Sequence, residues 1–154
     1  MSPTIQIWTD GGCQGNPGPG AWAFVLRSAD GTRERSGYEA LTTNNRMELI
    51  AVREALRELS LDAAWKGSAV TLSTDSQYVQ KGITEWIRAW EKNGWRTSAK
   101  KPVKNVDLWT AVAELARPLS ITWAWVMGHA GNEMNERCHS LVEESIARGG
   151  KQQR

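Results

Sequence analysis

The spacing of apolar residues along the chain predicts three strands at its start. Apolar and polar residues alternate over residues 5–9, over 21–27 and, more weakly, over 32–40, with the two-residue period of half-buried strands. Asp30-Gly31, between the second and third of these segments, is a typical hairpin turn. We therefore expect three antiparallel strands to open the fold.

The period then changes from two residues to that of a helix. Thr43 and Asn44 are among the cap residues that precede a helix extending to about Leu59, whose apolar stripe follows a 100° period. Beyond this helix, strand and helix patterns alternate. The predicted elements are a strand over 69–74, a short helix over 76–83, a helix over 105–116, a strand over 119–126 and a helix over 133–147.

Two of the predicted strands end in the same dipeptide, Thr-Asp, which places Asp10 and Asp75 directly after strands. Aspartate is a poor strand former, and each of these residues alone could simply begin a turn. If the two strands are neighbours in an α/β sheet, their carboxyl ends open into one crevice. Two carboxylates that close repel one another unless a cation lies between them.

Glu48 adds a third carboxylate. It falls within the apolar stripe of the helix over 44–59, so it would face the sheet, where an unpaired carboxylate is costly. A glutamate in the first turn of a helix can instead serve only to stabilise the helix dipole. Together with Asp10 and Asp75, Glu48 indicates a site for divalent cations with oxygen ligands, of which magnesium is typical.

Composition limits the class of protein. The 154 residues, 40% apolar and 23% charged, suit one globular domain. No apolar run reaches the length of a membrane span, and the first residues lack the features of a signal peptide, so we expect a cytoplasmic protein with no membrane partner. Cys13 and Cys138 are too few for a disulfide framework, and both are expected to be free thiols.

The positive charge is concentrated in the segment 81–104. This segment holds seven basic and two acidic residues, a net charge of +5 in a chain whose total is +2, interleaved with Trp86, Trp90 and Trp95. Trp86 and Trp90, four residues apart, could be the packed side of a solvated helix. Basic charge combined with aromatic side chains favours a surface that binds a nucleic-acid backbone.

The chain has two histidines. His129 lies in the glycine-containing loop 127–131, which leaves it free to move over a neighbouring site, although a lone loop histidine is usually only a surface residue. His139 lies at the edge of the apolar stripe of the last helix. Beyond that helix, the polar, glycine-containing segment 148–154 is expected to be a disordered tail.

Six segments match one known family in order along nearly the whole chain. They are Thr9-Asp10-Gly11 and residues 15–20, 43–48, 72–79, 100–109 and 128–138. In these segments the chain resembles the bacterial type 1 ribonucleases H. The resemblance implies an α/β ribonuclease H-like fold, with a five-stranded mixed sheet of three antiparallel strands and then two parallel strands, and with helices on both faces. It also implies a single domain over 1–147 that carries a basic protrusion at about 81–104 and hydrolyses the RNA strand of RNA/DNA hybrids.

The resemblance further implies the roles of individual residues. Asp10, Glu48 and Asp75 would bind two magnesium ions on either side of the scissile phosphate, and His129 matches a mobile histidine that assists proton transfer or product release. Contacts with the hybrid are implied for its minor groove, for a phosphate of its DNA strand and for the basic protrusion. The residues that match the minor-groove contacts are Cys13, Asn16, Asn44 and Gln77. Those that match the DNA-phosphate contact are Thr43 and Asn105. In the basic protrusion, the matching residues are Trp86, Trp90, Lys100, Lys101 and Lys104.

One position departs from the family pattern. His139 directly follows Cys138, where the family has a fourth metal-site aspartate. His139 is therefore either a metal ligand or a tolerated substitution at the least demanding ligand position. Imidazole suits manganese better than magnesium, so the departure predicts relatively better activity with manganese.

Three classes of function are open at this point. The first is a hybrid-specific endoribonuclease, expected to act as a monomer. The second is an RNA/DNA hybrid-binding module whose catalysis is weakened by the change at His139, against which the three retained carboxylates argue. The third is a transposase or integrase core of the same fold, which the short chain disfavours.

Overall fold

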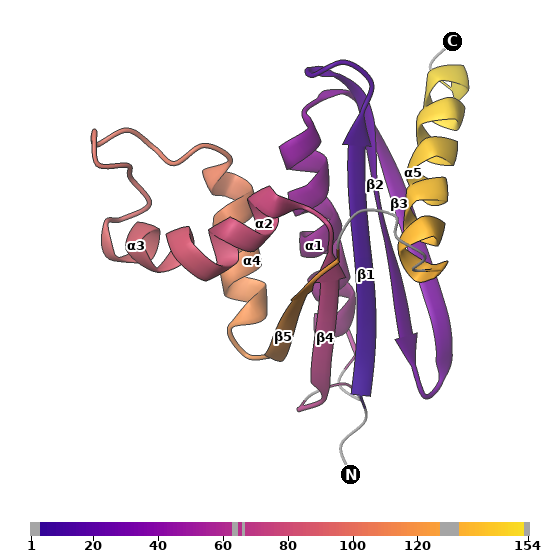
Figure 1. Ribbon diagram of the computed structural model, residues 1–154, viewed down its shortest axis with the longest axis horizontal. Helices are drawn as coiled ribbons and strands as arrows, with labels where there is room; N and C mark the ends of the chain where they lie inside the picture. The colour runs from indigo at the N-terminus through magenta and orange to yellow at the C-terminus, as the bar shows by residue number, and fades with distance from the viewer. Residues whose placement is uncertain (1–3, 63–64, 66, 127–132, 153–154) are drawn as a thin grey trace.

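The computed structural model describes residues 4–62, 65, 67–126 and 133–152. Within these residues, one five-stranded sheet has the order β3-β2-β1-β4-β5 (Figure 1). Its strands are β1 (Thr4–Cys13), β2 (Gly18–Ser28), β3 (Gly31–Thr42), β4 (Ala69–Thr74) and β5 (Ser120–Trp125). β2 is antiparallel to β1 and β3, whereas β4 is parallel to β1 and β5. The mixed sheet expected from the sequence is confirmed.

The central strand β1 brings two of the acidic residues together. Its parallel register with β4 ends at the pair Trp8 and Ser73. Asp10 and Asp75 each follow this pair by two residues, so they occupy corresponding positions at the carboxyl ends of neighbouring parallel strands. The predicted juxtaposition of Asp10 and Asp75 is therefore confirmed.

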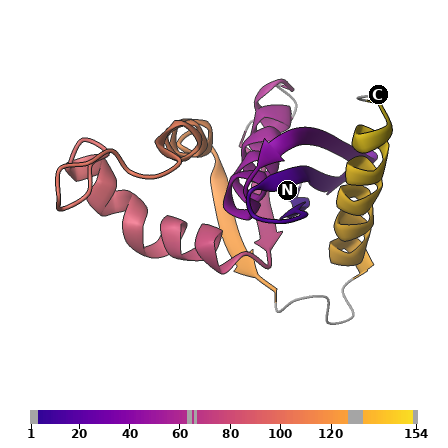
Figure 2. The same ribbon diagram turned by 90° about the horizontal axis from the view of Figure 1, so that it is seen from above.

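Helices cover both faces of the sheet, as predicted. They are α1 (Asn44–Ser60), α2 (Gln77–Lys81), α3 (Ile87–Lys92), α4 (Val106–Ala116) and α5 (Glu133–Gln152), with a π-helical turn, η2 (Gly82–Trp86), between α2 and α3. Figures 1 and 2 show α5 on one face of the sheet, against β1 to β3, and α1 on the other face with α4 beside it. No described helix is both long and apolar enough to cross a membrane.

The helix after β4 is longer than predicted. It was expected to end at about Ile83, but helical backbone continues through η2 and α3 to Lys92. Gly82 explains the continuation, because its backbone lies directly against the ring of Trp109, where a side chain would collide. A glycine that would ordinarily weaken a helix here allows close packing on α4.

The last helix is also longer than predicted. α5 extends to Gln152, so the expected disordered tail is wrong for residues 148–152. The backbone of Gly149 packs against the ring of Tyr38 in β3, and this contact anchors the helix beyond Ala147. The lysine and glutamine that follow are good helix formers despite their polarity.

The sheet separates two apolar clusters. The larger lies on the side of α1 and α4 and includes Phe24, Leu56 and Trp109, all fully buried. The smaller lies beneath α5. Its buried members are Trp8, Ala21, Ala23, Val25, Cys138, Leu141 and Val142. Both cysteines are free thiols, as predicted.

Candidate active site

Three carboxylates meet where β1 and β4 end. Asp10 belongs to β1, Asp75 follows β4, and Glu48 projects from α1; one oxygen atom of each lies within 4.8 Å of the others. Asp10 is 5% exposed and Glu48 is 7% exposed. α1 has no acidic residue in its first turn, so the interpretation of Glu48 as a helix-dipole residue is wrong. The predicted convergence of the three residues is confirmed.

Gly11 allows α1 to come this close to β1. A Cβ atom at Gly11 would lie 2.7 Å from the carbonyl oxygen of Met47 and would also collide with the amide nitrogen of Glu48. A larger residue would therefore push away the helix turn that carries Glu48. Gly11 was not among the predicted site residues. Its position directly after Asp10 was the only sequence signal for this role.

The environment of the site disfavours charge on its carboxylates. Burial, and next the charge of Asp75, raises the pKa of Asp10 from 3.8 to about 6. Burial, followed by the charges of Asp10 and Asp75, also raises the pKa of Glu48 well above its usual value of 4.5. Both shifts have the sign expected for buried acids of like charge.

The same groups fit a divalent cation. Oxygen Oε1 of Glu48 is buried and has no hydrogen-bond partner among the described residues, which leaves it available as a ligand. Carboxylate oxygens are the donors that magnesium prefers, and a cation would remove the repulsion between the acids. The described part of the chain thus holds a set of ligands that needs positive charge at its centre.

His139 lies beside this cluster. Its Nδ1 atom is 3.4 Å from Oδ2 of Asp10, and its Nε2 atom is 3.0 Å from Oε1 of Glu143 in the next turn of α5. The side chain is 43% exposed. The structure therefore places His139 next to Asp10 and in contact with solvent, on the side opposite α1. His129 lies outside the described residues.

Two of the four residues expected to contact the minor groove border a hollow of about 430 Å³ beside the carboxylates. Cys13, Asn44 and His139 are among the residues that line it. The thiol of Cys13 donates to the carbonyl oxygen of Gly15 at 2.8 Å. The backbone N–H of Asn44 donates to Oδ1 of Asn16 at 3.2 Å, which joins the β1–β2 turn to the start of α1.

The remaining member of this expected group, Gln77, is the exposed first residue of α2. Its helix is capped by Ser76, whose hydroxyl accepts from the N–H of Val79 at 3.1 Å. Ser76 directly follows Asp75. Gln77 therefore lies within two residues of the carboxylate cluster, on the side of the site toward α2.

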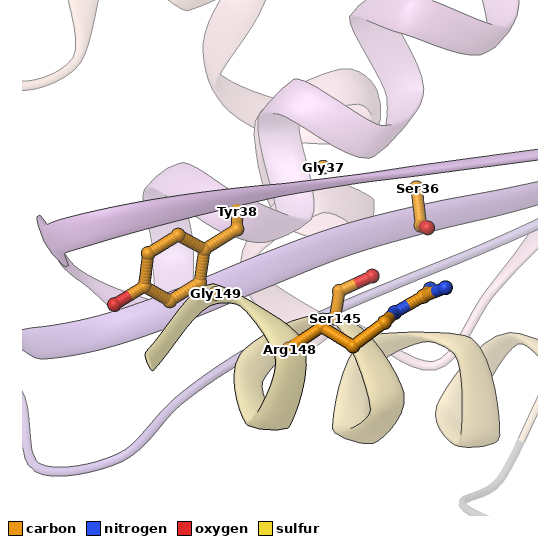
Figure 3. Close-up of a pocket in the computed structure, with 6 residues that line it drawn as sticks. All are labelled: Ser36, Gly37, Tyr38, Ser145, Arg148 and Gly149. Atoms are coloured by element: carbon orange, nitrogen blue, oxygen red, sulfur yellow. The ribbon is translucent and has the colours of Figure 1, made fainter. Parts of the chain in front are cut away.

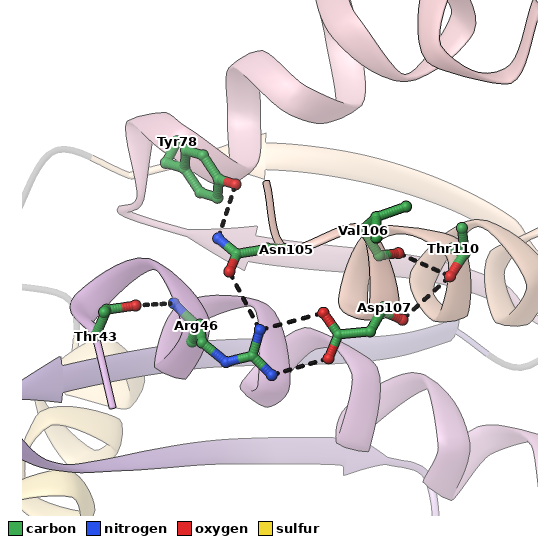
Figure 4. A network of polar contacts seen from close by, with 7 residues as sticks. All are labelled: Thr43, Arg46, Tyr78, Asn105, Val106, Asp107 and Thr110. Atoms are coloured by element: carbon green, nitrogen blue, oxygen red, sulfur yellow. Dashed lines mark hydrogen bonds and ion pairs between the residues drawn. The ribbon is translucent and has the colours of Figure 1, made fainter. Parts of the chain in front are cut away.

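A polar network links the two residues that were expected to bind a DNA phosphate (Figure 4). The hydroxyl of Thr43 caps α1 by accepting from the N–H of Arg46 at 3.2 Å. The guanidinium of Arg46 donates to Oδ1 of Asn105 at 3.2 Å and to both carboxylate oxygens of Asp107 at 3.2 and 2.9 Å. The amide of Asn105 in turn donates to the hydroxyl of Tyr78 at 3.1 Å. Thr43 and Asn105, although far apart in sequence, are thus both tied to Arg46, Thr43 through the backbone N–H and Asn105 through the guanidinium.

Asn105 has a left-handed backbone, with φ of 60° and ψ of 31°. Asparagine tolerates this conformation better than most residues. The contact with Arg46 fixes the orientation of the Asn105 side-chain amide. Its oxygen faces the guanidinium of Arg46, and its nitrogen faces the hydroxyl of Tyr78. One hydrogen of the Asn105 amide remains for another acceptor.

The basic protrusion, residues 81–104, is built on aromatic contacts. The rings of Trp86, Trp90 and Trp95 form a chain, with centroids 5.7 Å and 6.4 Å apart, and Trp90 also contacts Trp109 of α4 at 5.5 Å. The tryptophans are half-buried, so the packing role that the sequence left open is real. Lys100, Lys101 and Lys104 are exposed.

Relatives of known sequence match this chain over almost its full length. Residues 2–147 match the family model described as RNase H. The ribonuclease H of Hydrogenovibrio crunogenus is 51% identical over 142 residues, which cover 92% of this chain and 94% of that protein. The ribonuclease H of Mesorhizobium japonicum is 52% identical over 147 residues, which cover 96% of this chain and 80% of that protein.

Solved structures agree with the sequence matches. LC9-RNase H1, described as a type 1 RNase H with the type 2 active-site motif, superposes with a TM-score of 0.84 at 30% identity, over 96% of this chain and 74% of that one. LC11-RNase H1, solved in complex with RNA/DNA hybrid, superposes with a TM-score of 0.73 at 25% identity, over 94% of this chain and 98% of that one. Because sequence, fold and the acidic cluster agree, the chain belongs to the ribonuclease H family, with type 1 proteins of bacteria among its relatives.

Proposed function

We propose that this protein hydrolyses the RNA strand of RNA/DNA hybrids at Asp10, Glu48 and Asp75, leaving 5′-phosphate and 3′-hydroxyl ends. Membership of the ribonuclease H family supports the hydrolase activity, and a relative solved with an RNA/DNA hybrid supports the substrate. The observation that carries the proposal is the meeting of three carboxylates within 4.8 Å, two of them buried.

The proposed cofactor is a pair of divalent cations, with magnesium as the physiological ion. Asp10, Glu48 and Asp75 would hold them. Two such ions supply an activated water and stabilise the leaving oxygen in phosphoryl transfer. The chain itself contributes the fixed positions of the carboxylates: Gly11 keeps Glu48 close to Asp10, and the parallel register of β1 and β4 aligns Asp10 with Asp75.

The proposed contacts with the hybrid surround this centre. Cys13, Asn16, Asn44 and Gln77 would lie along the minor groove, where the 2′-hydroxyl distinguishes RNA from DNA. Thr43 and Asn105 would bind a phosphate of the DNA strand, and the free amide hydrogen of Asn105 supports this assignment.

The basic protrusion would bind the backbone of the hybrid. Lys100, Lys101 and Lys104 are exposed, as phosphate contacts require. Trp86 and Trp90 would add contacts on their exposed edges while packing the protrusion against α4.

His139 is proposed as the residue that sets the metal requirement. The three carboxylates supply one negative charge fewer than a site with four, so the protein should hold at least one ion more weakly. We therefore expect a higher metal requirement and relatively better activity with manganese than in the variant His139→Asp. Equal metal profiles for the two proteins would show that His139 is a tolerated neighbour of Asp10 and not a ligand.

Further parts of the proposal rest on the family resemblance. They are a role for His129 in proton transfer or product release, action as a monomer, a single domain over 1–147 and a location in the cytoplasm. Each is separable from the assignment of the carboxylates.

The direct experiment compares labelled RNA/DNA hybrid, duplex RNA and duplex DNA, each with magnesium, manganese or EDTA. Cleavage of the hybrid RNA alone, and only with metal, is the expected result. Asp10→Asn, Glu48→Gln and Asp75→Asn should each abolish cleavage, whereas Glu114→Gln, which changes an exposed carboxylate on α4, should not. Binding of the hybrid without cleavage under every metal condition would favour the binding-module hypothesis instead.

A further inference from the structure

A second polar hollow lies between β3 and the last turns of α5. Its volume is about 190 Å³ (Figure 3). The residues that line it are Ser36, Gly37, Tyr38, Ser145, Arg148 and Gly149. None of them belongs to the carboxylate site or to the proposed contacts with the hybrid.

The alternation of β3 explains why this hollow exists. Ser36 and Tyr38, two residues apart, face α5, whereas Gly37 between them packs against the ring of Trp22 on the opposite face. From the helix, Gly149 meets the ring of Tyr38 without a side chain of its own. The helix backbone therefore approaches the strand closely at Gly149, and the serines beside this contact are left facing one another across the hollow.

The polar groups of the hollow are unused. Ser145 is only 6% exposed, yet its hydroxyl has no hydrogen-bond partner among the described residues. Ser36 and Arg148 likewise form no hydrogen bond or ion pair within that part of the chain. Figure 3 shows the hydroxyls of Ser36 and Ser145 directed toward the side where the Arg148 guanidinium lies, while the Tyr38 hydroxyl points away. A hydroxyl that opens into a hollow and has no partner from the protein is available to a ligand there.

The chemistry of the hollow selects an anion. A guanidinium has only donors, and two serine hydroxyls can donate as well. The acidic residues of β3 do not compete. Glu34 is paired with Arg137 at 2.7 Å, and Glu39, one residue after Tyr38, interacts electrostatically with Arg46 of α1, on the other face of the sheet. The C-terminal end of α5 carries about half a negative charge from the helix dipole. The full positive charge of Arg148 exceeds it, so the local charge at the hollow stays positive. A planar guanidinium matches the oxygens of phosphate in particular.

We infer that this hollow binds a phosphate group through Arg148, Ser36 and Ser145. Arg148 follows His139 by nine residues, which is about 14 Å along the helix and half a turn around it. The hollow is therefore on the flank of α5 that faces away from the carboxylates, and its phosphate is separate from the one that is cleaved. The group can come from free phosphate or from the backbone of a nucleic acid that extends around α5.

The test uses the full chain in EDTA, so that no hybrid is cleaved, and follows backbone amide resonances by NMR. Inorganic phosphate and an intact RNA/DNA hybrid are titrated separately at constant ionic strength. Shifts at residues 36, 37, 145 and 149 are expected. Arg148→Gln and Ser36→Ala should each weaken the apparent affinity, Arg148→Gln by about tenfold because it removes the charged partner. Arg117→Gln, which removes an exposed arginine charge from the end of α4, is the matched control and should leave the affinity unchanged.

The two titrations separate the sources of the phosphate. Shifts with inorganic phosphate alone support a site for free phosphate, and shifts with the hybrid support a site for its backbone. Absence of shifts at these residues in both titrations overturns the inference. So does an affinity that Arg148→Gln and Arg117→Gln reduce equally, because that result would report only the net charge of the protein.

Discussion

Replacing Asp10 with asparagine should stabilise the metal-free protein at alkaline pH while abolishing activity. Raising the pKa of Asp10 from 3.8 to about 6 corresponds to about 3 kcal/mol, at about 1.4 kcal/mol for each tenfold change in proton affinity. Because the folded state disfavours the ionised acid, this cost is absent below pH 3.8, grows as the pH rises and is complete above pH 6. An asparagine avoids it.

The gain in the free energy of unfolding should be somewhat smaller than the full cost of ionising Asp10 in the folded protein. The buried amide group must also be accommodated, and it loses the favourable contacts of the carboxylate with Gly11 and His139. We therefore expect the free energy of unfolding of Asp10→Asn to exceed that of the unmodified chain by about 1–3 kcal/mol at pH 8, with little difference at pH 4.

The assay is denaturant unfolding in EDTA and in magnesium at both pH values, followed by circular dichroism. Magnesium should stabilise the unmodified chain, because an ion that binds only the folded state shifts the unfolding equilibrium, and should stabilise Asp10→Asn less. Glu114→Gln serves as the control for loss of an exposed carboxylate. An Asp10→Asn variant that is no more stable than the unmodified chain in EDTA at pH 8 would refute the reasoning, as would an equal gain at pH 4.

Three further predictions concern the surroundings of the site. Gly11→Ala should reduce cleavage far more than hybrid binding, because its methyl group would displace the backbone that carries Glu48; normal activity would contradict the role of Gly11. Tyr78→Phe should lower the free energy of unfolding by about 1–3 kcal/mol, since it leaves the N–H of the fully buried Trp109 without its acceptor at 2.9 Å, whereas an exposed hydroxyl would cost little. Neutralising the three exposed lysines of the basic protrusion should weaken hybrid binding more than single-turnover cleavage. It should also reduce the slope of log affinity against log salt by roughly one per lost contact, and an unchanged slope would mean that the lysines touch no phosphate.

Much of the fold and the centre of the site could be predicted because they depend on short-range patterns. The two-residue period located the strands, and the helical period placed Glu48 on the buried side of α1. Two strands ending in Thr-Asp were enough to predict that Asp10 and Asp75 meet, since the parallel arrangement of such strands brings their carboxyl ends to one edge. Each of these inferences needs only the geometry of one element and one rule of packing.

The features that could not be predicted depend on contacts between distant segments. The helix after β4 extends beyond its predicted end at Ile83 because Gly82 packs on Trp109. No local sequence pattern predicts that contact. The network that orients Asn105 requires Arg46, which comes from a helix about sixty residues earlier. The resemblance to the ribonucleases H supplied Asn105 as a binding residue, but only the structure shows what holds its amide in place.

The two apolar clusters on either side of the sheet divide the site between separately stabilised parts of the molecule. Asp10, Glu48 and Asp75 come from the first half of the chain, on or next to the central strands and on α1, whose buried residues belong to the larger cluster. His139 instead lies on α5, which packs on the smaller cluster of seven mostly small buried residues. A helix with less buried apolar surface opens at a lower free energy than the elements around the main core. In amide hydrogen exchange, α5 should therefore behave as its own cooperative unit, exchanging before α1. The three carboxylates can then stay in place while α5, which carries His139, is transiently open. The residue at position 139 can therefore change in sequence without altering the arrangement of Asp10, Glu48 and Asp75.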